Sequence, residues 1–501
     1  MSHAISQPDT QVVRFVLDGA AVEVADVPPS MTVLEYLREV VGRKGTKEGC
    51  AEGDCGACTV VLGELAAEGQ HMEYRAINSC IRFLATIDGK ELITVESLQD
   101  RNGELHPVQQ AMVDCHGSQC GFCTPGFVMS LFALYLARES ATRADVVQAL
   151  SGNLCRCTGY RPIIDAGQCM SSYPEPVHWS RSDAQSAVRV DRLRSIQRTR
   201  SDSTLRFPGF HAPRSLEELA SALEAAPHSL ILAGGTDIGL WTTKQLRELP
   251  PMIYIGEIRE LRQIQRSNAG LCIGAAVPLS AAWSALRRDR PALAELAERF
   301  ASPPVRNSGT LCGNISNGSP IGDSMPSLIA LGAEIELRHG ARQRRIPLEQ
   351  FYLGYQKKAL APGEFVVSVS TPAPKSGQRF ATYKLAKRID QDISAVCAAF
   401  AVEVCEGRVV SARLAYGGMS AIPARASHAE QALIGQPWSE ASFNAAMRAL
   451  ASDFSPLTDA RASQGYRLRT AGSLLRRFYL EQTPGAGVLR VTDPSLDVEF
   501  T

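Results

Sequence analysis

The segment KEGCAEGDCGACTV, residues 47–60, places three cysteines in one glycine-rich loop. Their spacing is Cys50-x4-Cys55-x2-Cys58, and a fourth cysteine, Cys80, follows after 21 residues. Two irons bridged by sulfide need four thiolates, and this spacing is typical of a plant-type 2Fe-2S site. Glycines let backbone amides approach the cluster sulfurs. Because four cysteines also suit zinc, a zinc knuckle is the alternative.

A second set of four cysteines forms two short hooks, Cys120-x2-Cys123 and Cys155-x-Cys157. Each hook precedes a predicted helix that has proline in its first turn. Helix amino termini carry unpaired N–H groups and partial positive charge, which offset the negative charge of four thiolates and sulfide. The pattern therefore indicates a second 2Fe-2S site, with buried thiols between helices as the alternative.

The remaining cysteines have no such companions in the sequence. Ten of the fourteen cysteines lie between Cys50 and Cys169, a distribution that favours metal ligation over a disulfide framework in a long chain. The six others are predicted to be small buried hydrophobic side chains: Cys115, Cys169, Cys272, Cys312, Cys397 and Cys405.

Length and composition describe a multidomain globular protein. At 501 residues the chain is too long for one ordinary core, and its net charge of zero gives no field that favours a nucleic acid. The amino terminus, MSHAISQPDTQVVRF, lacks the apolar region of a leader, and no stretch reaches the roughly 18 apolar residues of a membrane span. A cytoplasmic location without a membrane partner is expected.

Apolar periodicity predicts two small domains in the first third of the chain. Residues 11–24 alternate around an Asp-Gly turn, which predicts a β-hairpin, and a helix from Thr32 and strands near Thr59 and Leu92 complete an α+β domain over 11–94. Over 95–173 the spacing turns helical. The four helices are predicted near 108–113, 126–136, 144–150 and 162–166.

The rest of the chain is predicted to contain a linker and two further domains. Residues 174–205 are charge-rich and lack a sustained apolar face, which predicts an interdomain linker. Over 206–376, short β runs alternate with helices and glycine-rich loops, which predicts an α+β domain. A smaller α+β domain is predicted over 378–487.

Two glycine-rich loops in this α+β domain fit neither the Rossmann GxGxxG nor the Walker pattern. They are ILAGGTDI, residues 231–238, and PVRNSGTLCGNI, residues 304–315. Such loops turn several amides toward one point and hold a pyrophosphate without a lysine. On physical grounds alone, an ordinary tight turn explains each loop equally well.

Four segments together resemble the xanthine dehydrogenase and aldehyde oxidase family of molybdenum hydroxylases: KEGCAEGDCGACTV, INSCI, GSQCGFCTPGFVMSL and GNLCRCTGYRPI. The resemblance implies an α+β multidomain fold with four domains. These are a β-grasp, ferredoxin-like 2Fe-2S domain, a four-helix 2Fe-2S domain, an FAD-binding domain and a CO-dehydrogenase-flavoprotein-like C-terminal domain. The implied iron ligands are Cys50, Cys55, Cys58, Cys80, Cys120, Cys123, Cys155 and Cys157.

The same resemblance implies the FAD contacts. The first glycine-rich loop would line the FAD phosphates with Ile231, Leu232, Ala233, Gly234, Gly235, Thr236, Asp237 and Ile238. Further contacts would come from Phe300, Thr310, Asn314, Asp323, Val366 and Lys384.

Three further positions follow from the resemblance. Tyr355 and the segment Arg388–Asp392 match the region where the family brings nicotinamide to the flavin, although a surface loop explains them equally well. Cys312 stands where glycine is more usual and places a thiol near the flavin, with its redox role open. Gln119 is a candidate contact with the partner's molybdopterin.

The resemblance also implies a function. Electrons from oxidation of hypoxanthine and xanthine to urate at a partner's molybdenum would pass through the helical-domain cluster, the β-grasp cluster and FAD to NAD. The family's catalytic half is longer than this chain, so a separate large molybdopterin-binding subunit is expected, in an (αβ)2 heterotetramer, and no catalytic acid or base is expected here. The alternatives are a subunit of an aldehyde or N-heterocycle hydroxylase and a non-enzymatic zinc-binding assembly factor.

Overall fold

The computed structural model describes residues 12–66, 69–182, 186–198, 204–389 and 391–483, with residues 485, 487 and 490. The amino-terminal residues before 12, which include the start of the predicted hairpin, and parts of the predicted linker lie outside this set. The described residues form two compact units. The first takes residues within 1–222, with 228–258 and 302–309; the second takes 223–227, 259–301 and residues within 310–501.

The first unit begins with a five-stranded mixed sheet in the order β2-β1-β5-β3-β4. Its strands are β1 (Val13–Leu17), β2 (Ala20–Val24), β3 (Thr59–Leu65), β4 (Met72–Asn78) and β5 (Glu91–Ile93). Strands β1 and β2 pair around Asp18 and Gly19, whose φ values of 49° and 82° suit a tight hairpin turn. Strand β1 pairs in parallel with β5. The predicted hairpin and α+β domain are confirmed.

A capping box explains where the first helix of this domain begins. Thr32 Oγ1 accepts from the Glu35 amide at 3.1 Å, and the Glu35 carboxylate accepts from the Thr32 amide at 2.7 Å. The helix α1 (Val33–Glu35) continues as the π-helical turn η1 (Tyr36–Val40). Its apolar side chains Val33, Tyr36 and Leu37 pack into the core under the sheet.

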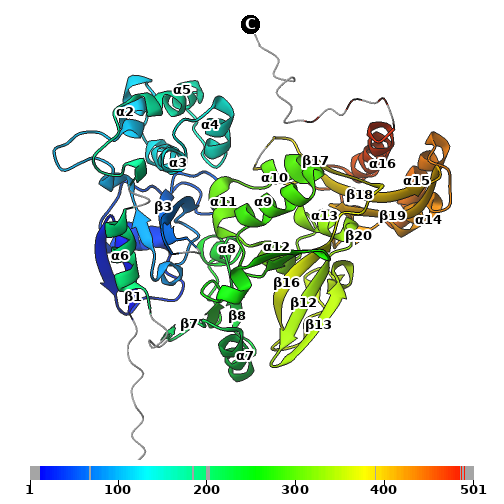
Figure 1. Cartoon of the computed structure of the whole chain (residues 1–501), viewed down its shortest axis with the longest axis horizontal. Coiled ribbons are helices and arrows are strands. Elements are labelled where there is room, and N and C mark those ends of the chain that lie inside the picture. Colours follow the sequence, from blue (N-terminus) through cyan, green and yellow to red (C-terminus); the bar gives the residue numbers. More distant parts are fainter. Residues whose placement is uncertain are drawn as a thin grey trace, which may run out of the picture. The chain divides into compact units, whose positions relative to one another are not determined.

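Four helices follow and lie together (Figure 1). They are α2 (Pro107–Asp114), α3 (Thr124–Ala137), α4 (Arg143–Leu150) and α5 (Arg161–Cys169). Helices α3 and α5 carry proline in the first turn, as predicted, because that position needs no amide donor. Phe127, Phe132, Tyr135 and Trp179 are fully buried between them. The predicted four-helix domain is confirmed.

Helix α6 (Ala187–Ile196) lies within the range predicted as a linker. The sequence did not predict this helix, because only Val190 and Leu193 on it are buried. They pack against Val16 and Met72 in a small core. The Arg189 guanidinium lies 3.6 Å from the centre of the Trp179 ring. Charged side chains therefore contribute to packing here, which a hydrophobic pattern does not reveal.

The first unit also contains part of the predicted FAD domain. A four-stranded sheet has the order β6-β7-β9-β8, with β6 (Leu205–Phe207), β7 (Phe210–Ala212), β8 (Leu230–Leu232) and β9 (Met252–Tyr254). The helices are α7 (Leu216–Ala225), which ends in the second unit, α8 (Ile238–Thr243) and α11 (Pro303–Ser308). Leu205, Phe210 and Leu232 share one hydrophobic core with Phe15 and Leu92. Strand β8 and the β-grasp sheet are therefore packed as one body.

The second unit contains three sheets. Their strand orders are β10-β11-β16-β12-β13, β14-β15 and β17-β18-β19-β20. The strands are β10 (Ile264–Ser267), β11 (Gly270–Gly274), β12 (Glu334–His339), β13 (Arg342–Pro347), β14 (Tyr352–Gly354), β15 (Lys357–Lys358), β16 (Phe365–Pro372), β17 (Gln378–Leu385), β18 (Val396–Cys405), β19 (Arg408–Gly417) and β20 (Ala424–Arg425). The helices are α9 (Leu279–Asp289), α10 (Ala294–Glu298), α12 (Leu311–Asn317), α13 (Ser324–Ala330), α14 (Ser427–Leu433), α15 (Glu440–Asp453) and α16 (Gln464–Glu481).

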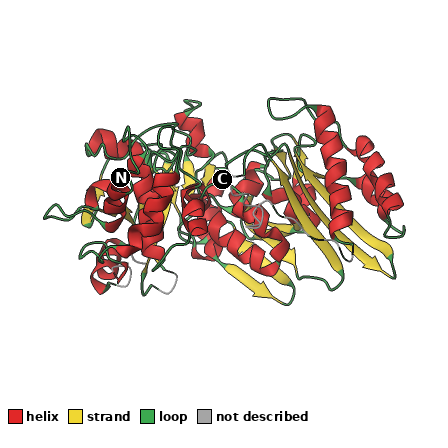
Figure 2. Ribbon diagram, turned by 90° about the horizontal axis from the view of Figure 1, so that it is seen from above, coloured by secondary structure: helices red, strands yellow, loops and turns green. Residues whose placement is uncertain are grey.

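Strand β18 shows how the last sheet divides its side chains between two layers. Val396, Ala398 and Phe400 point into a core formed with α14, α15 and α16, whereas Cys397 points to the opposite face and contacts Asp323 beside α13. Figure 2 shows the long strands of this unit accompanied by helices. The predicted C-terminal α+β domain is confirmed.

Among the residues that the structure describes, no helix combines the length and apolar character that crossing a membrane requires.

Candidate functional site

The first cysteine set is surrounded by backbone amides. Cys50 Sγ accepts from the amides of Glu52, Asp54 and Cys55 at 3.5, 3.4 and 3.3 Å. The Cys50 amide in turn donates to Cys55 Sγ at 3.3 Å. A side chain at Gly49 would place its Cβ 2.7 Å from the Cys55 sulfur. The loop therefore offers the sulfurs N–H donors and no bulk, as a thiolate cluster requires.

The other two cysteines of this set form a separate, buried pair. Cys58 and Cys80 are 1% and 2% exposed, and their sulfurs lie 3.3 Å apart. The described residues contain no group of three or more potential ligands converging on the position of one metal ion. Two pairs of thiols suit a cluster of two irons, in which each iron takes two thiolates.

Within each pair of this set, the two thiols shift each other's pKa in opposite directions. A hydrogen bond from Cys55, helped by backbone amides and opposed by burial, lowers the pKa of Cys50 to about 4, while the pKa of Cys55 is raised. The hydrogen bond with Cys80 similarly lowers the pKa of Cys58, and the pKa of Cys80 is raised well above its usual range. Because the thiolate is the form that binds iron, the lowered pKa values of Cys50 and Cys58 favour the form that a cluster needs.

The second cysteine set lies around the start of two helices. Cys123 is the residue before α3, and Cys155 and Cys157 precede α5. Cys157 Sγ lies 3.7 Å from Cys120 Sγ and 3.8 Å from Cys155 Sγ. Cys120 and Cys157 are exposed, whereas Cys155 is buried. The structure thus brings together the four residues that the sequence proposed.

The two inner sulfurs of the second set have different pKa values. Burial alone would raise the pKa of Cys155, but hydrogen bonds from the Thr158 hydroxyl at 3.0 Å and amide at 3.5 Å lower it to about 7. Burial and the neighbouring Cys155 raise the pKa of Cys123 to about 12. Thr158 is a contact that the sequence did not single out.

The two cysteine sets are joined by a direct hydrogen bond. The Leu154 amide donates to the Cys55 carbonyl at 2.9 Å, and the Asn153 side chain donates to the Gly56 carbonyl at 3.1 Å. Gly56 and Gly126 pack so closely that a Cβ on Gly126 would lie 2.1 Å from the Gly56 oxygen. Asn153 was not predicted, since its partner is 97 residues away in the sequence.

The first glycine-rich loop, residues 231–238, is packed against two other segments of the first unit. A Cβ on Gly234 would lie 2.1 Å from the Ser308 carbonyl oxygen, so the position requires glycine. The Ser308 hydroxyl beside it is buried without a hydrogen-bond partner. The unpartnered Ser308 hydroxyl beside this loop is a candidate for polar contact with a cofactor such as FAD.

Helix α8 connects this loop to the first cysteine set. A Cβ on Gly239, in the first turn of α8, would lie 2.7 Å from the carbonyl oxygen of Ile81, the residue after Cys80. At the other end of α8, Thr243 Oγ1 donates to the Ala51 carbonyl at 2.7 Å, and Lys244 Nζ donates to the Cys50 carbonyl at 3.0 Å. No sequence signal points to Thr243 or Lys244, because both contacts are long-range.

Four of the remaining proposed FAD contacts lie close together in the second unit. Lys384 Nζ and the Ser394 hydroxyl each donate to the Asp323 carboxylate at 2.6 Å. Ser324, the residue after Asp323, donates to the Asn314 side chain at 2.5 Å, and Thr310 caps the helix that carries Asn314. Ser394 is a member of this network that the sequence did not predict.

The other positions carried over by resemblance fall in different settings. Phe300 is buried against the Trp283 ring at 5.2 Å, and Val366 lies in strand β16. Tyr355 is 61% exposed, in keeping with the surface-loop alternative. Arg388, Ile389 and Asp392 are described, whereas Asp390 lies outside the described residues.

Cys312 is a buried thiol on helix α12. It is 2% exposed, and its sulfur lies 3.8 Å from the Ile273 carbonyl of strand β11. Burial raises its pKa well above the usual range. These contacts are those of a packed, protonated side chain.

The prediction for the six remaining cysteines is confirmed in part. Cys312 and Cys397 are buried, as predicted, whereas Cys272 in strand β11 is only half-buried. The prediction is wrong for Cys405, which is exposed because it ends strand β18 at a turn. It is also wrong for Cys115 and Cys169, which are half-buried and have each other as companions at 3.4 Å. Their contact joins the ends of two helices, which the spacing in the sequence does not show.

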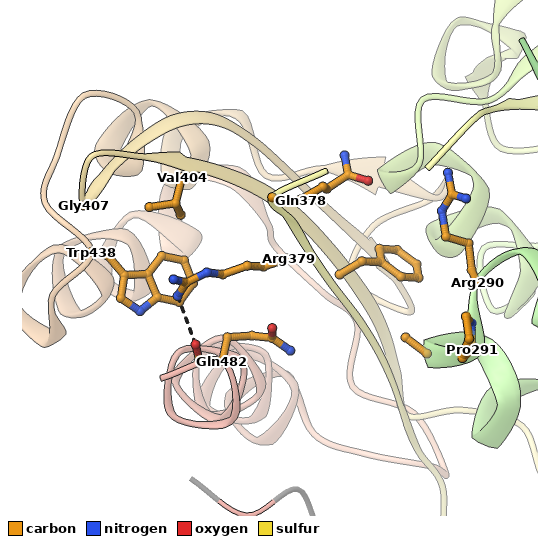
Figure 3. A pocket seen from close by; sticks show the side chains of 11 residues that line it. Arg290, Pro291, Gln378, Arg379, Val404, Gly407, Trp438 and Gln482 are labelled. Carbon is orange, nitrogen blue, oxygen red and sulfur yellow. Dashed lines mark hydrogen bonds between the residues drawn. The ribbon is translucent and has the colours of Figure 1, made fainter. Parts of the chain in front are cut away.

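Figure 3 shows a pocket of about 780 Å³ in the second unit, between strand β17 and the end of α16. The Arg379 guanidinium lies 4.1 Å from the centre of the Trp438 ring and donates to the Gln482 carbonyl at 3.0 Å. The lining contains none of the proposed cofactor residues. We interpret Arg379 as an anchor for the carboxyl end of α16.

Comparison with protein-family models gives four matches along the chain. They are a 2Fe-2S iron-sulfur cluster binding domain over 15–84, a [2Fe-2S] binding domain over 94–168, the FAD binding domain in molybdopterin dehydrogenase over 203–374, and the CO dehydrogenase flavoprotein C-terminal domain over 381–482. The chain is thus an iron–sulfur flavoprotein with two 2Fe-2S domains and one FAD-binding domain.

Individual relatives identify the family. The chain is 32% identical to a xanthine dehydrogenase of Emericella nidulans, over 93% of this chain and 38% of that protein, and 30% identical to the xanthine dehydrogenase/oxidase of Gallus gallus, over 93% and 40%. It spans less than half the length of these relatives. A solved carbon monoxide dehydrogenase from Hydrogenophaga pseudoflava matches with a TM-score of 0.51 and 30% identity, over 55% of this chain and 96% of that one. The chain belongs to the molybdenum hydroxylase family, which confirms the resemblance and the fold class.

Proposed function

We propose that this chain is the electron-transfer subunit of a xanthine dehydrogenase. It would take electrons from molybdopterin on a large partner subunit and pass them through two 2Fe-2S clusters and FAD to NAD, in a cytoplasmic (αβ)2 heterotetramer. When bound, these cofactors supply the redox chemistry, while the protein sets their positions and surroundings. The observation that carries the proposal is that hydrogen bonds within the first unit join the second cysteine set to the first, and the first set to the helix that follows the glycine-rich loop.

The second cysteine set is the proposed entry point. Cys120 and Cys157 are exposed, and Phe122 and Leu154 beside them are 47% and 41% exposed. Gln119 is exposed next to Cys120. Exposed apolar side chains around a redox site suit a protein partner, because burying them favours association. We place the molybdopterin-bearing partner on this face.

The hydrogen bond between the two sets supports transfer from the second cluster to the first. Cys55 and Cys155 belong to different sets, yet their backbones are close. The Cys55 carbonyl accepts a hydrogen bond from the amide of Leu154, which is the residue before Cys155. Asn153 fixes this contact, since its Oδ1 accepts from the Ser130 hydroxyl at 2.6 Å while its amide donates to Gly56. The residues thereby hold the two sites at a fixed short separation.

The packing of α8 supports transfer from the first cluster to the flavin. The proposed phosphate loop leads directly into α8, whose first turn lies on Ile81 and whose last residues bond the Cys50 loop. The resemblance assigns further FAD contacts to the second unit. Among these contacts, Lys384 forms an ion pair with Asp323. Its positive charge would act on a bound flavin.

Metal and flavin analysis tests the proposal most directly. Anaerobically purified protein is expected to contain about four irons, about four acid-labile sulfides and one FAD per chain. Zinc without flavin would instead support the assembly-factor alternative and defeat the relay.

Removing one proposed ligand tests the order of the relay. Cys155→Ser is expected to abolish the second cluster's spectrum and xanthine-driven NAD reduction by the complex with its partner, and to leave FAD bound. Cys405→Ser, which changes an exposed cysteine outside both sets, is the matched control. Undiminished NAD reduction in Cys155→Ser would rule out a relay through the second cluster.

The acceptor is tested on this chain alone. Anaerobic NADH should bleach the flavin and both clusters by reverse transfer. If NADH has no effect while a chemical reductant bleaches all three groups, the relay stands and NAD is not the acceptor.

The substrate has one competing assignment within the family. Curated relatives over most of this chain are xanthine dehydrogenases, whereas solved matches include carbon monoxide dehydrogenases. We therefore keep a subunit of another molybdenum hydroxylase, acting on an aldehyde or N-heterocycle, as the second candidate. Copurification with the partner and assay of xanthine against these substrates separates the two.

A further inference from the structure

Cys115 and Cys169 form a thiol pair outside the two cysteine sets. Cys115 ends α2 as its C-cap, and Cys169 is the last residue of α5. Their sulfurs lie 3.4 Å apart, at contact distance, and neither thiol is in a disulfide. Both residues are half-buried, so the pair is not sealed inside the helical core.

The geometry allows a covalent bond with little movement. A disulfide needs the sulfurs at about 2.05 Å, so they must approach by little more than an ångström. Both cysteines are at helix ends, so the bond would join two termini and would not cross the interior of a helix. Besides Cys115, the Cys169 thiol contacts the Ala166 carbonyl at 3.5 Å, a long contact that closing the bond would give up.

The surroundings of Cys115 disfavour its thiolate form at neutral pH. Burial first, and then the hydrogen bond with Cys169, raise the pKa of Cys115 to about 11. The carboxylates of Asp114 and Asp165 act in the same direction, and the Tyr173 hydroxyl, which also faces the pair, donates to Asp114 at 2.7 Å. Because the thiolate is the attacking species, exchange should accelerate as pH rises.

We propose that Cys115 and Cys169 form a reversible disulfide by exchange with a small-molecule disulfide. The first thiolate attacks the reagent and releases one small thiol, leaving a mixed disulfide on the protein. The second thiolate then displaces the other small thiol and closes the protein bond. Two protein thiols are oxidised, one reagent disulfide is reduced to two thiols, and no other oxidant is needed.

The bond would enclose the second cysteine set. Cys115 and Cys169 are 54 residues apart, and Cys120, Cys123, Cys155 and Cys157 all lie between them. Closing this loop would tie the end of α2 to the end of α5 and restrict opening of the segment that holds the second cluster. This part of the inference rests on the proposed function, whereas formation of the bond does not.

Oxidised glutathione provides the test on the cofactor-loaded protein. Incubation without oxygen at about pH 8.5 should give a peptide that links Cys115 to Cys169, faster than at about pH 7. Cys115→Ser should carry one glutathione on Cys169, and Cys169→Ser one on Cys115, without the linked peptide. Cys405→Ser should form the link as the unchanged protein does. A mixed disulfide in the unchanged protein that never resolves into the link would overturn the proposal.

Cluster retention tests the consequence separately. With an iron chelator, the linked protein should lose its second-cluster absorbance at least about tenfold more slowly than the reduced protein. The first cluster should be lost at the same rate in both. If the linked and the reduced protein lost the second-cluster absorbance at the same rate, the bond would have no role in retaining the cluster, although it would still form. Protein that never held iron would instead count against the proposed function.

Discussion

The two cysteine sites each bring four thiols together, but their surroundings differ. The first lies in a glycine-rich loop covered by α8, and Cys58 and Cys80 are buried. The second lies at helix starts, and its outer residues Cys120 and Cys157 are exposed. Three backbone amides face the Cys50 sulfur at the first site, whereas at the second site the hydroxyl and the amide of Thr158 face the Cys155 sulfur. The two sites thus differ in access, because the outer cysteines of the second site are open to solvent whereas Cys58 and Cys80 of the first are enclosed.

The largest effect is expected where the two sites touch. In Gly56→Ala the new Cβ would lie 2.2 Å from the Gly152 carbonyl oxygen, at a residue with φ of +70°. Strain and overlap should lower the free energy of unfolding by more than about 4 kcal/mol and disturb both clusters. Visible circular dichroism and denaturant unfolding would measure this.

Gly42→Ala is the control for backbone strain alone. Gly42 has φ of +76°, and no atom lies within 4 Å of the point that a Cβ would occupy, so this variant should lose only about 1 kcal/mol. If both variants lost the same free energy of unfolding, the contact between the two cysteine sites would contribute nothing to stability.

The next effect is a loss of stability at acid pH in the helical domain, which carries the second site. Burial lowers the pKa of His106, which caps α2, to about 4, and its hydrogen bond to the Trp179 carbonyl only partly opposes this. The folded pKa lies below the unfolded value near 6.5, so the unfolded chain binds more protons between these values. Stability is therefore complete above about pH 6.5 and falls by about 3 kcal/mol as pH approaches 4.

Unfolding followed by second-cluster absorbance between pH 7 and 4.5 measures this slope. His106→Asn keeps a good capping side chain and removes the titration, so its slope should be flatter. An unchanged slope in His106→Asn would assign the acid sensitivity to other groups.

A smaller effect is expected on the first site only. Lys244 Nζ donates to the Cys50 carbonyl at 3.0 Å, and its side chain is 43% exposed. Removing the positive charge in Lys244→Gln should lower the first cluster's reduction potential by about 50 mV after allowance for solvent screening. Lys244→Arg keeps the charge and should restore most of the potential in a spectroscopic titration. A shift in the second cluster instead would contradict the assignment of Lys244 to the first.

The smallest effect should leave both sites unchanged. Arg379→Ala removes the contact with Trp438 and the bond to the Gln482 carbonyl, which should cost about 1 kcal/mol in the second unit. A lower unfolding midpoint with unaltered cluster spectra is the expected result. Arg379→Lys keeps the charge without the planar group and should recover only part of the loss.

The sequence predicted elements whose signals are local. The Asp18-Gly19 hairpin, the proline-led helices and the alternation of strand β18 all follow from neighbouring residues. The grouping of cysteines into two sets also followed from spacing, because thiolates that share a cluster need compact loops. Family resemblance, rather than pattern, suggested Asp323 and Lys384, which the structure joins by an ion pair.

Contacts between distant segments could not be predicted. Asn153 with Gly56 and Lys244 with Cys50 depend on how folded pieces meet, and no local pattern encodes them. Helix α6 escapes prediction because arginines do part of its packing. Cys115 and Cys169 look isolated in the sequence because the helices that bring them together are separated by most of the helical domain.

One contact in the first unit has a consequence for synthesis on the ribosome. The segment 302–309 belongs to this unit, and Asn307 donates to the Ala76 carbonyl at 2.9 Å. Translation must therefore proceed through residue 309 before the unit that carries the two cysteine sets can close. Until then, the edge of strand β4 that Asn307 contacts stays uncovered on the nascent chain.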